Sequence, residues 1–180
     1  MALRRLFIAA ALTTDVRHAL AARFDQIAIP GRRVEPANWH VTLRFIGEVD
    51  EDIVDRLRFS LDQFDLGDRF RIRWGSLGAF PRAAKATVLW LGLRRGAVEL
   101  AALESAVDSA VVSAGVTGEE RPFRPHLTVS RIRPPQDVTG LVETVDPGEV
   151  SMPVERVLLM ESHLGRGGVR YEQVDSFELG

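Results

Sequence analysis

The apolar positions along the chain follow two different periods, which predict a mixture of strands and helices. Residues 3–10 form a nearly continuous apolar run, typical of a buried strand. Val16, Leu20 and Phe24 then recur at the spacing of one helix face. Residues 39–46 alternate between apolar and polar side chains, which predicts a strand with one buried face.

The same two patterns recur in the rest of the chain. We expect helices over residues 50–64 and 98–114, and strands over 69–80, 86–93, 124–132, 150–162 and 168–179. The prolines at 134 and 135 should end the strand over 124–132, and a glycine-rich turn should join the last two strands. Because helices are few and strands come in hairpins, the predicted class is α+β, not a doubly wound parallel sheet.

Length and cysteine content narrow the class of protein. The 180 residues suit one domain, or two small lobes that share a core. Cysteine is absent, which excludes disulfides, thiolate nucleophiles and iron–sulfur clusters, and favours a reducing cytoplasm. The first twelve residues have the look of a short signal peptide, but they lead into a helical pattern and not a cleavage site. No apolar run approaches the ~18 residues that a membrane-spanning helix needs.

The overall charge excludes a broadly polycationic coat protein for nucleic acids but leaves room for a local basic site. The formal net charge is −2, and Lys85 is the only lysine among 23 basic residues. Genomic composition is the simplest explanation for most of the arginines. Residues 121–136 nevertheless contain four arginines and no acidic residue.

The strongest chemical signal is a repeated tetrapeptide, His-apolar-Thr-apolar. It occurs at residues 40–43 (HVTL) and again at residues 126–129 (HLTV), so it includes two of the four histidines. On a strand, residues i and i+2 point to the same face, roughly 6.7 Å apart. Each motif therefore presents its histidine and threonine on one face and directs its apolar residues to the core.

A pair of imidazoles next to hydroxyl groups suits phosphodiester chemistry. The imidazole pKa of ~6.5 allows one neutral histidine to accept a proton from a nucleophile while a charged one donates to the leaving group. Threonine hydroxyls are small donors that can hold nonbridging phosphate oxygens. Metal ligation is the competing interpretation, but it needs further Asp, Glu or His ligands, whereas the motifs supply threonine.

Arg131 is the ambiguous member of the basic segment. It lies five residues after His126, so strict alternation places it on the opposite face of the strand. It can reach the histidines only if the strand bulges or ends there. A phosphate clamp and a solvated strand end therefore both remain open at this point.

The remaining histidines and the nearby aromatic residues are given structural roles. We expect His18 on the surface of the first helix and His163 in a structural or exposed position beside the last turn. Trp39 and Phe45 lie off the His40 face by periodicity, so they and Phe7 are expected in the core. An aromatic ring near a nucleotide site could also stack on a base, worth ~1–3 kcal/mol.

With these two motifs, the sequence resembles the two-histidine phosphoesterase superfamily, whose signature is two His-x-Thr-x motifs about half a chain apart. The flanking segments are similar to those of bacterial and archaeal RNA 2',3'-cyclic phosphodiesterases, which are also named 2'-5' RNA ligases. The segments that carry this resemblance are residues 5–9, 38–48, 89–93, 121–131 and 161–164. The resemblance runs from about residue 3 to residue 179.

The resemblance implies a fold and an activity. The fold would be two pseudo-symmetric lobes of antiparallel sheet, with helices on the outer faces and a central cleft, in one bilobal domain of residues 1–180. The activity would be hydrolysis of RNA or nucleoside 2',3'-cyclic phosphate ends to 2'-phosphomonoesters, with the 3' oxygen as leaving group. No metal or cofactor would be needed, and no membrane or obligate protein partner, so we expect a cytoplasmic monomer.

The resemblance also implies a role for each site residue. His40 would be the general acid and His126 the general base. Thr42, Thr128 and Arg131 would bind the phosphate. Phe7 and Arg124 would contact the nucleotide.

Two alternatives and one departure from the family remain. The same residues could join a 2',3'-cyclic end to a 5'-hydroxyl as a 2'-5' linkage, because both reactions use the same pair of histidines for proton transfer. A non-catalytic module that binds phosphorylated RNA ends is a further alternative, although binding alone would favour Arg or Lys over histidine. Family members often carry several consecutive basic residues after the Phe-Pro of the middle hairpin, whereas residues 80–85 here include only Arg82 and Lys85. This leaves open how RNA beyond the terminal phosphate is held.

Overall fold

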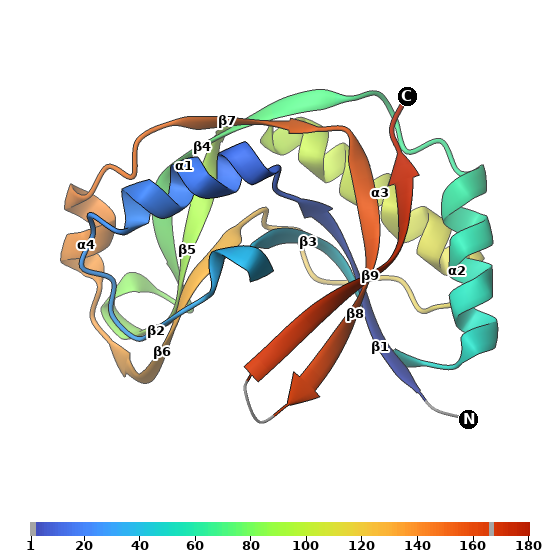
Figure 1. The fold of residues 1–180 in the computed structure, drawn as a ribbon, viewed down its shortest axis with the longest axis horizontal. Helices are drawn as coiled ribbons and strands as arrows, with labels where there is room; N and C mark the ends of the chain where they lie inside the picture. The colour runs from blue at the N-terminus through green and yellow to red at the C-terminus, as the bar shows by residue number, and fades with distance from the viewer. Residues whose placement is uncertain (1–2, 166–167) are drawn as a thin grey trace.

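A curled antiparallel sheet dominates the computed structural model, which describes residues 3–165 and 168–180 (Figure 1). Its strands are β1 (Arg4–Ala11), β2 (Arg32–Arg33), β3 (His40–Val49), β4 (Phe70–Phe80), β5 (Ala86–Arg95), β6 (Leu127–Gln136), β7 (Val150–Val154), β8 (Arg156–Gly165) and β9 (Gly168–Glu178). The helices are α1 (Thr14–Phe24), α2 (Glu51–Gln63), α3 (Ala97–Ser113) and α4 (Thr139–Thr144), with 3-10 turns η1 (Pro36–Asn38) and η2 (Ala83–Lys85).

The sheet consists of two four-stranded halves. Its strand order is β7-β4-β5-β6-β3-β1-β8-β9, and β2 pairs with β6 outside this path. The halves meet where β3 lies beside β6, with Val41 opposite Leu127. The succession β1-α1-β3-α2 in the first part of the chain recurs as β5-α3-β6-α4 in the second. These features confirm the predicted α+β class with two pseudo-symmetric halves.

The helices pack on one side of the sheet and bury the apolar residues of the strands (Figure 1). Helix α3 lies against β3, β4 and α2, while α1 packs beside β7 and α4 beside β4. Val41 and Leu127 both have 0% of their surface exposed and belong to this core. Side chains that alternate with them must therefore point to the opposite side of the sheet.

Two of the expected strand boundaries are wrong. Strand β6 does not end before Pro134 and Pro135 but continues to Gln136. Its pairing with β5 is irregular over this stretch, because Val88 faces Arg131 and Ala86 faces Gln136. Proline, which has no backbone N–H to donate, is tolerated at such an irregularity.

The expected single strand over residues 150–162 is two strands. Strand β7 pairs with β4 in one half of the sheet, whereas β8 pairs with β1 and β9 in the other. The chain crosses between the halves at Glu155, and the apolar pattern carries no signal of that crossing. Of the expected glycine-rich turn, residues 166–167 lie outside the described residues.

The other expected elements are found with ends within a few residues of the predicted ones. The sequence patterns missed only short elements, among them β2 and α4. Within the described ranges, every helix is too short or too polar to cross a lipid bilayer.

Candidate active site

The two histidine motifs come together where the halves of the sheet meet. Because Val41 faces Leu127 in an antiparallel pair, His40 is the neighbour of Thr128, and Thr42 is the neighbour of His126. Cross-strand neighbours have Cβ atoms about 4.5–5.5 Å apart. All four side chains are half-buried and lie on the side of the sheet away from the helices. His40, Thr42, His126 and Thr128 thus form one polar strip, which we call the motif strip.

Each imidazole is held in the same way by the backbone that precedes it. The Nδ1 of His40 lies 2.8 Å from the carbonyl oxygen of Asn38, and the Nδ1 of His126 lies 2.7 Å from that of Arg124. A carbonyl oxygen only accepts hydrogen bonds, so each Nδ1 carries a hydrogen. Each Nε2 is therefore left for proton exchange, as an acceptor when the ring is neutral and as a donor when it is charged.

Aromatic rings surround His40. The Phe7 ring lies 4.8 Å from the imidazole, between centroids, at an interplanar angle of 37°. Tyr171 of β9 meets the imidazole edge-on, at 5.0 Å and 88°, and lies 5.0 Å from Phe7. Contacts of this kind restrict the orientation of the imidazole.

The surroundings of His40 also change its acidity. Burial lowers its pKa below the usual 6.5, because the charged ring loses hydration. The hydrogen bond to Asn38 opposes this effect, while the positive charges of His126 and Arg131 lower the pKa further. Both groups thus lie within electrostatic range of the His40 ring.

A similar arrangement surrounds His126 in the other half of the sheet. Phe80 meets its imidazole edge-on at 5.0 Å and 86°, and Trp90 lies 6.3 Å away. A Cβ atom at Gly78 would lie 2.2 Å from the Trp90 ring. Glycine at position 78 therefore allows the indole to lie flat across β4, in contact with Phe80.

A bulge in β6 determines the position of Arg131. Strand β5 pairs Leu89 with Ser130 but the next residue, Trp90, with Thr128, so β6 carries one extra residue at Val129. The alternation of buried and exposed residues shifts accordingly, and Arg131 becomes exposed on the same face as Thr128. Without such a bulge, strict alternation would direct Arg131 to the face opposite His126.

Strand β3 has an equivalent bulge, which overturns one expectation. Ala9 of β1 pairs with Thr42, whereas the preceding Ile8 pairs with Arg44, so Leu43 is the extra residue. The shift makes Phe45 59% exposed, beside Phe7, so the prediction that Phe45 lies in the core is wrong. Trp39 is buried as expected.

The residues that follow the two extra residues are polar and buried, and both are hydrogen-bonded. Ser130 Oγ donates to the carbonyl oxygen of Pro30 at 2.6 Å. Arg44 Nε donates to Asp108 Oδ1 at 2.6 Å, and its NH2 group donates to the carbonyl oxygen of Thr117. Arg44 thereby ties β3 to α3 and to the loop that leads into β6. A buried guanidinium without such partners would be strongly destabilising.

Of the two residues predicted to contact the nucleotide, Phe7 is buried and Arg124 is exposed. Phe7 is only 3% exposed and packs on His40, so its predicted direct contact with a nucleotide does not agree with this placement. The exposed aromatic ring on this face is Phe45. Arg124 is exposed, two residues before His126.

The other two histidines lie outside the motif strip. His18 is exposed on α1. His163 is on β8, with its Nε2 3.3 Å from a carboxylate oxygen of Glu172 and 3.9 Å from one of Glu161. These positions agree with the structural or exposed roles expected for both.

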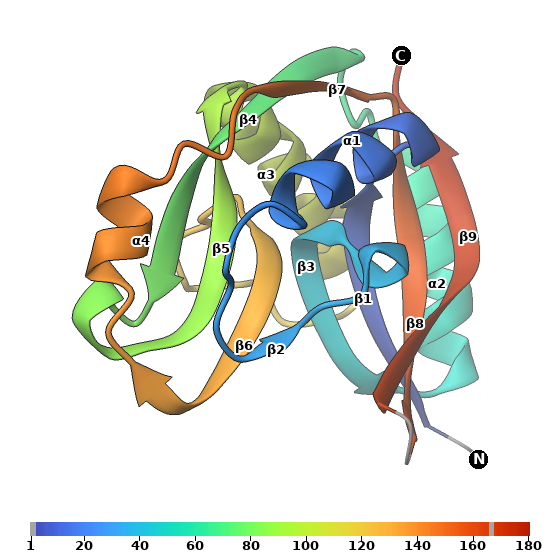
Figure 2. The same cartoon turned by 60° about the vertical axis from the view of Figure 1, so that its left-hand side comes forward.

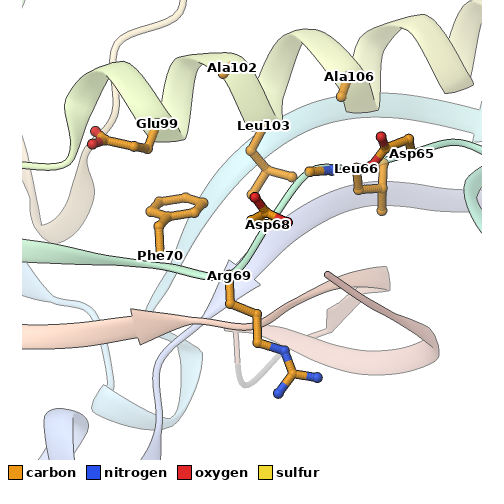
Figure 3. A pocket seen from close by; sticks show the side chains of 10 residues that line it. Asp65, Leu66, Asp68, Arg69, Phe70, Glu99, Ala102, Leu103 and Ala106 are labelled. Atoms are coloured by element: carbon orange, nitrogen blue, oxygen red, sulfur yellow. Dashed lines mark hydrogen bonds between the residues drawn. The ribbon is translucent and has the colours of Figure 1, made fainter. Parts of the chain in front are cut away.

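Two features of the surface bear on competing sites. In residues 3–165 and 168–180, no three histidine or carboxylate side chains gather as a metal site would require. A hollow of about 350 Å³ between α3 and the loop before β4 is lined by acidic residues such as Asp65, Asp68 and Glu99 (Figure 3). It lies on the helix side of the sheet and contains none of the motif residues.

The sequence patterns missed two residues next to His40. Tyr171, the only tyrosine in the chain, comes from the last strand and carries no periodic signal. Asn38 holds His40 through its carbonyl oxygen, and its Nδ2 donates to the carbonyl oxygen of Val169 at 3.2 Å. Asn38 thus links the β8–β9 hairpin, which carries Tyr171, to the first motif.

Comparison with known proteins gives a consistent picture. The sequence profile of the 2'-5' RNA ligase superfamily matches residues 10–166. The chain is 37% identical over 160 residues to a protein named RNA 2',3'-cyclic phosphodiesterase from Aeropyrum pernix, covering 85% of this chain and 90% of the relative. It is 32% identical to a protein of the same name from Bacillus subtilis, over 88% of this chain and 86% of the relative. The crystal structure of E. coli LigT in apo form is similar with a TM-score of 0.83, at 27% identity and over 99% of both chains.

Proposed function

The chain belongs to the 2'-5' RNA ligase superfamily, and on this basis we propose that it hydrolyses 2',3'-cyclic phosphate ends of RNA or nucleosides to 2'-phosphomonoesters. The relatives from Aeropyrum pernix and Bacillus subtilis carry the name of this activity. The observation that carries the proposal is the pairing of Val41 with Leu127, which sets His40 and His126 on one face with both Nε2 atoms available.

In the proposed mechanism, His126 is the general base and His40 the general acid. The neutral Nε2 of His126 accepts a proton from water as the water oxygen attacks phosphorus. The bond from phosphorus to the 3' oxygen breaks, and the charged His40 donates its Nε2 proton to that oxygen. The products are a 2'-phosphomonoester and a 3'-hydroxyl.

The phosphate would be held by groups from both motifs. The hydroxyls of Thr42 and Thr128 can donate to its nonbridging oxygens, and the Arg131 guanidinium can pair with its charge. This anion also bears on the acid, because a negative charge beside an imidazole raises its pKa. Substrate binding would thus offset the burial that lowers the pKa of His40 in the free protein.

The nucleoside would lie beside the motif strip. We assign base stacking to the exposed ring of Phe45 and leave Phe7 as the support for His40. Arg124, exposed two residues before His126, remains a proposed contact to the nucleotide.

Ligation is the second candidate, favoured by the name of the matching superfamily. In this reaction a 5'-hydroxyl replaces water: His126 accepts its proton, the 5' oxygen attacks phosphorus, and His40 protonates the departing 3' oxygen, so that a 2'-5' linkage forms. Incubation of a cyclic-phosphate RNA end with and without a 5'-hydroxyl RNA acceptor separates the two reactions.

The proposal includes no metal, no cofactor and no protein partner, and it describes a cytoplasmic monomer. The donors on the motif strip are two histidines and two threonines, which favour proton transfer over metal binding. The lack of cysteine suits a reducing compartment. Light scattering of the purified protein tests the oligomeric state, and cell fractionation tests the location.

The decisive experiment is incubation with nucleoside 2',3'-cyclic monophosphates, followed by identification of the phosphomonoester formed. We expect the 2'-phosphate. A 3'-phosphate would overturn the assignment of the leaving group, and no turnover of either mononucleotides or cyclic-phosphate RNA would contradict the proposed activity.

A further inference from the structure

We propose that Arg32 is a second phosphate-binding residue, which contacts the phosphodiester on the 5' side of the terminal nucleotide. The site would then favour RNA ends of two or more nucleotides over free cyclic mononucleotides. This inference rests on the proposed function and adds a preference for chain length to it.

The pairing of β2 with β6 places Arg32 on the face of the catalytic motifs. Arg32 lies directly opposite Arg131, so the two side chains share one face of the sheet. Figure 2 shows β2 beside β6. Strand β2 pairs with β6 beyond the point where β3 pairs with it at Leu127. Because Val129 is an extra residue in β6, the arginine pair lies two regular steps past Thr128, about 7 Å along the strand at ~3.3 Å per residue.

Two like charges directly opposite each other on neighbouring strands are unfavourable unless something neutralises them. Among the described residues, no carboxylate lies within ion-pair distance of Arg32 or Arg131. The adjacent Arg33 differs, because its NH2 group lies 3.1 Å from Asp25 Oδ1. The sheet therefore sets side by side two arginines whose charges the described part of the protein leaves free for an anion.

The guanidinium of Arg32 lies between the two halves of the sheet. A Cβ atom at Gly168 would be only 2.8 Å from its NH2 group, so the side chain reaches the turn end of the β8–β9 hairpin. The same hairpin is tied to Asn38 through Val169 and carries Tyr171 against His40. Arg32 therefore lies on the same side of the molecule as His40, where RNA that extends from the motif strip could contact it.

The positive charge on this face exceeds what a single cyclic phosphate can balance. A 2',3'-cyclic phosphate carries a single negative charge, which one guanidinium can pair with in bidentate fashion. The site has Arg131 and the charged His40 for that phosphate, so the charge of Arg32 is left over. A second phosphate in the RNA chain would balance it. This contact would take the place of the basic run that residues 80–85 lack.

The test compares adenosine 2',3'-cyclic phosphate with the dinucleotide ApA that ends in a 2',3'-cyclic phosphate. We expect Arg32→Met to lower kcat/KM for the dinucleotide about tenfold and to leave the mononucleotide within about twofold. Arg33→Met is the matched control, since it removes a neighbouring arginine on the other face, and it should change neither. Equal losses on both substrates, or no loss on either, would overturn the proposal.

A binding measurement keeps the inference separate from the proposed activity. Titration with ApA bearing a terminal 2'-phosphate, at several salt concentrations, counts the phosphates in contact with cationic side chains. For a single strand, losing one such contact should reduce the slope of log K against log salt by about 0.7. An unchanged slope in Arg32→Met would refute the contact, whereas failure to hydrolyse either cyclic substrate would contradict only the proposed function.

Discussion

Val41 and Leu127 face each other across β3 and β6, and through this pair the two halves of the sheet are joined in register. Both side chains are fully buried. Their neighbours along each strand are the histidines and threonines of the two motifs. The pairing that buries Val41 and Leu127 in the core therefore also brings the two histidines and two threonines together on the opposite side of the sheet.

Removing the side chain of Leu127 should destabilise the protein strongly. Leu127→Ala leaves a cavity where the halves meet, and we expect a loss of about 2–5 kcal/mol in the free energy of unfolding, measured by urea denaturation. Leu164→Ala is the matched control, because Leu164 is 68% exposed and its truncation should cost less than about 0.5 kcal/mol. Similar losses in the two variants would show that the packing at this junction is unimportant.

Removing either motif imidazole should abolish hydrolysis without unfolding the protein. A single general acid or base contributes about 10²–10⁴-fold, so His40→Ala and His126→Ala should each lower kcat by at least about 10²-fold. Circular dichroism should match the unaltered protein. His18→Ala, at an exposed position on α1, should retain full activity. Normal turnover in either motif variant would defeat the acid–base assignment.

The pH dependence should reveal which histidine is the acid. The general acid must be protonated, so the alkaline limb of kcat/KM reports its pKa in the free protein. Burial lowers the pKa of His40, which places that limb below pH 6.5 if His40 is the acid. The corresponding limb of kcat should lie at higher pH, because the bound phosphate raises the pKa.

The same lowered pKa affects stability. The unfolded chain binds a proton at His40 more readily than the folded protein does, so folding stability should fall as the pH drops from about 6.5 through the folded-state pKa. In His40→Gln this contribution to the pH dependence of stability should vanish.

For the activity profile, an alkaline limb of kcat/KM well above pH 6.5 in the unaltered protein would argue that a group other than His40 is the acid.

The ring of Tyr171 should help to keep His40 shielded from water. Tyr171→Ala removes the edge-on contact, so the pKa of His40 should rise towards 6.5, as followed by NMR titration of the imidazole. Tyr171→Phe preserves the ring and should leave the pKa unchanged. If the phenylalanine variant shifted the pKa as far as the alanine variant, the hydroxyl group and not the ring would be responsible.

Chelation should not affect the reaction. Because the motif strip offers hydroxyl donors and imidazoles in place of a carboxylate cluster, we expect activity in excess EDTA to stay within about twofold of the untreated protein. The comparison requires enzyme dialysed against EDTA and assayed with and without added divalent ions. Loss of activity that Mg²⁺, Mn²⁺ or Zn²⁺ restores would support metal ligation by the histidines.

Local patterns were sufficient to predict most of the elements and the composition of the motif strip. Alternation along residues 40–43 and 126–129 placed each histidine with its threonine, because the two-residue period of a strand is a property of the backbone itself. Helical spacing identified α1, α2 and α3 in the same way. The residues that we propose for acid–base chemistry can therefore be identified from the sequence alone.

What only the tertiary structure decided depends on pairing between distant strands. The bulges at Leu43 and Val129 depend on the register set by the partner strands β1 and β5, and they bring Phe45 and Arg131 to the face that carries the two histidine motifs. Tyr171 reaches His40 only because β9 lies two strands from β1. The sequence determined which side chains each strand offers to a face, whereas long-range hydrogen bonding between strands determined which faces meet.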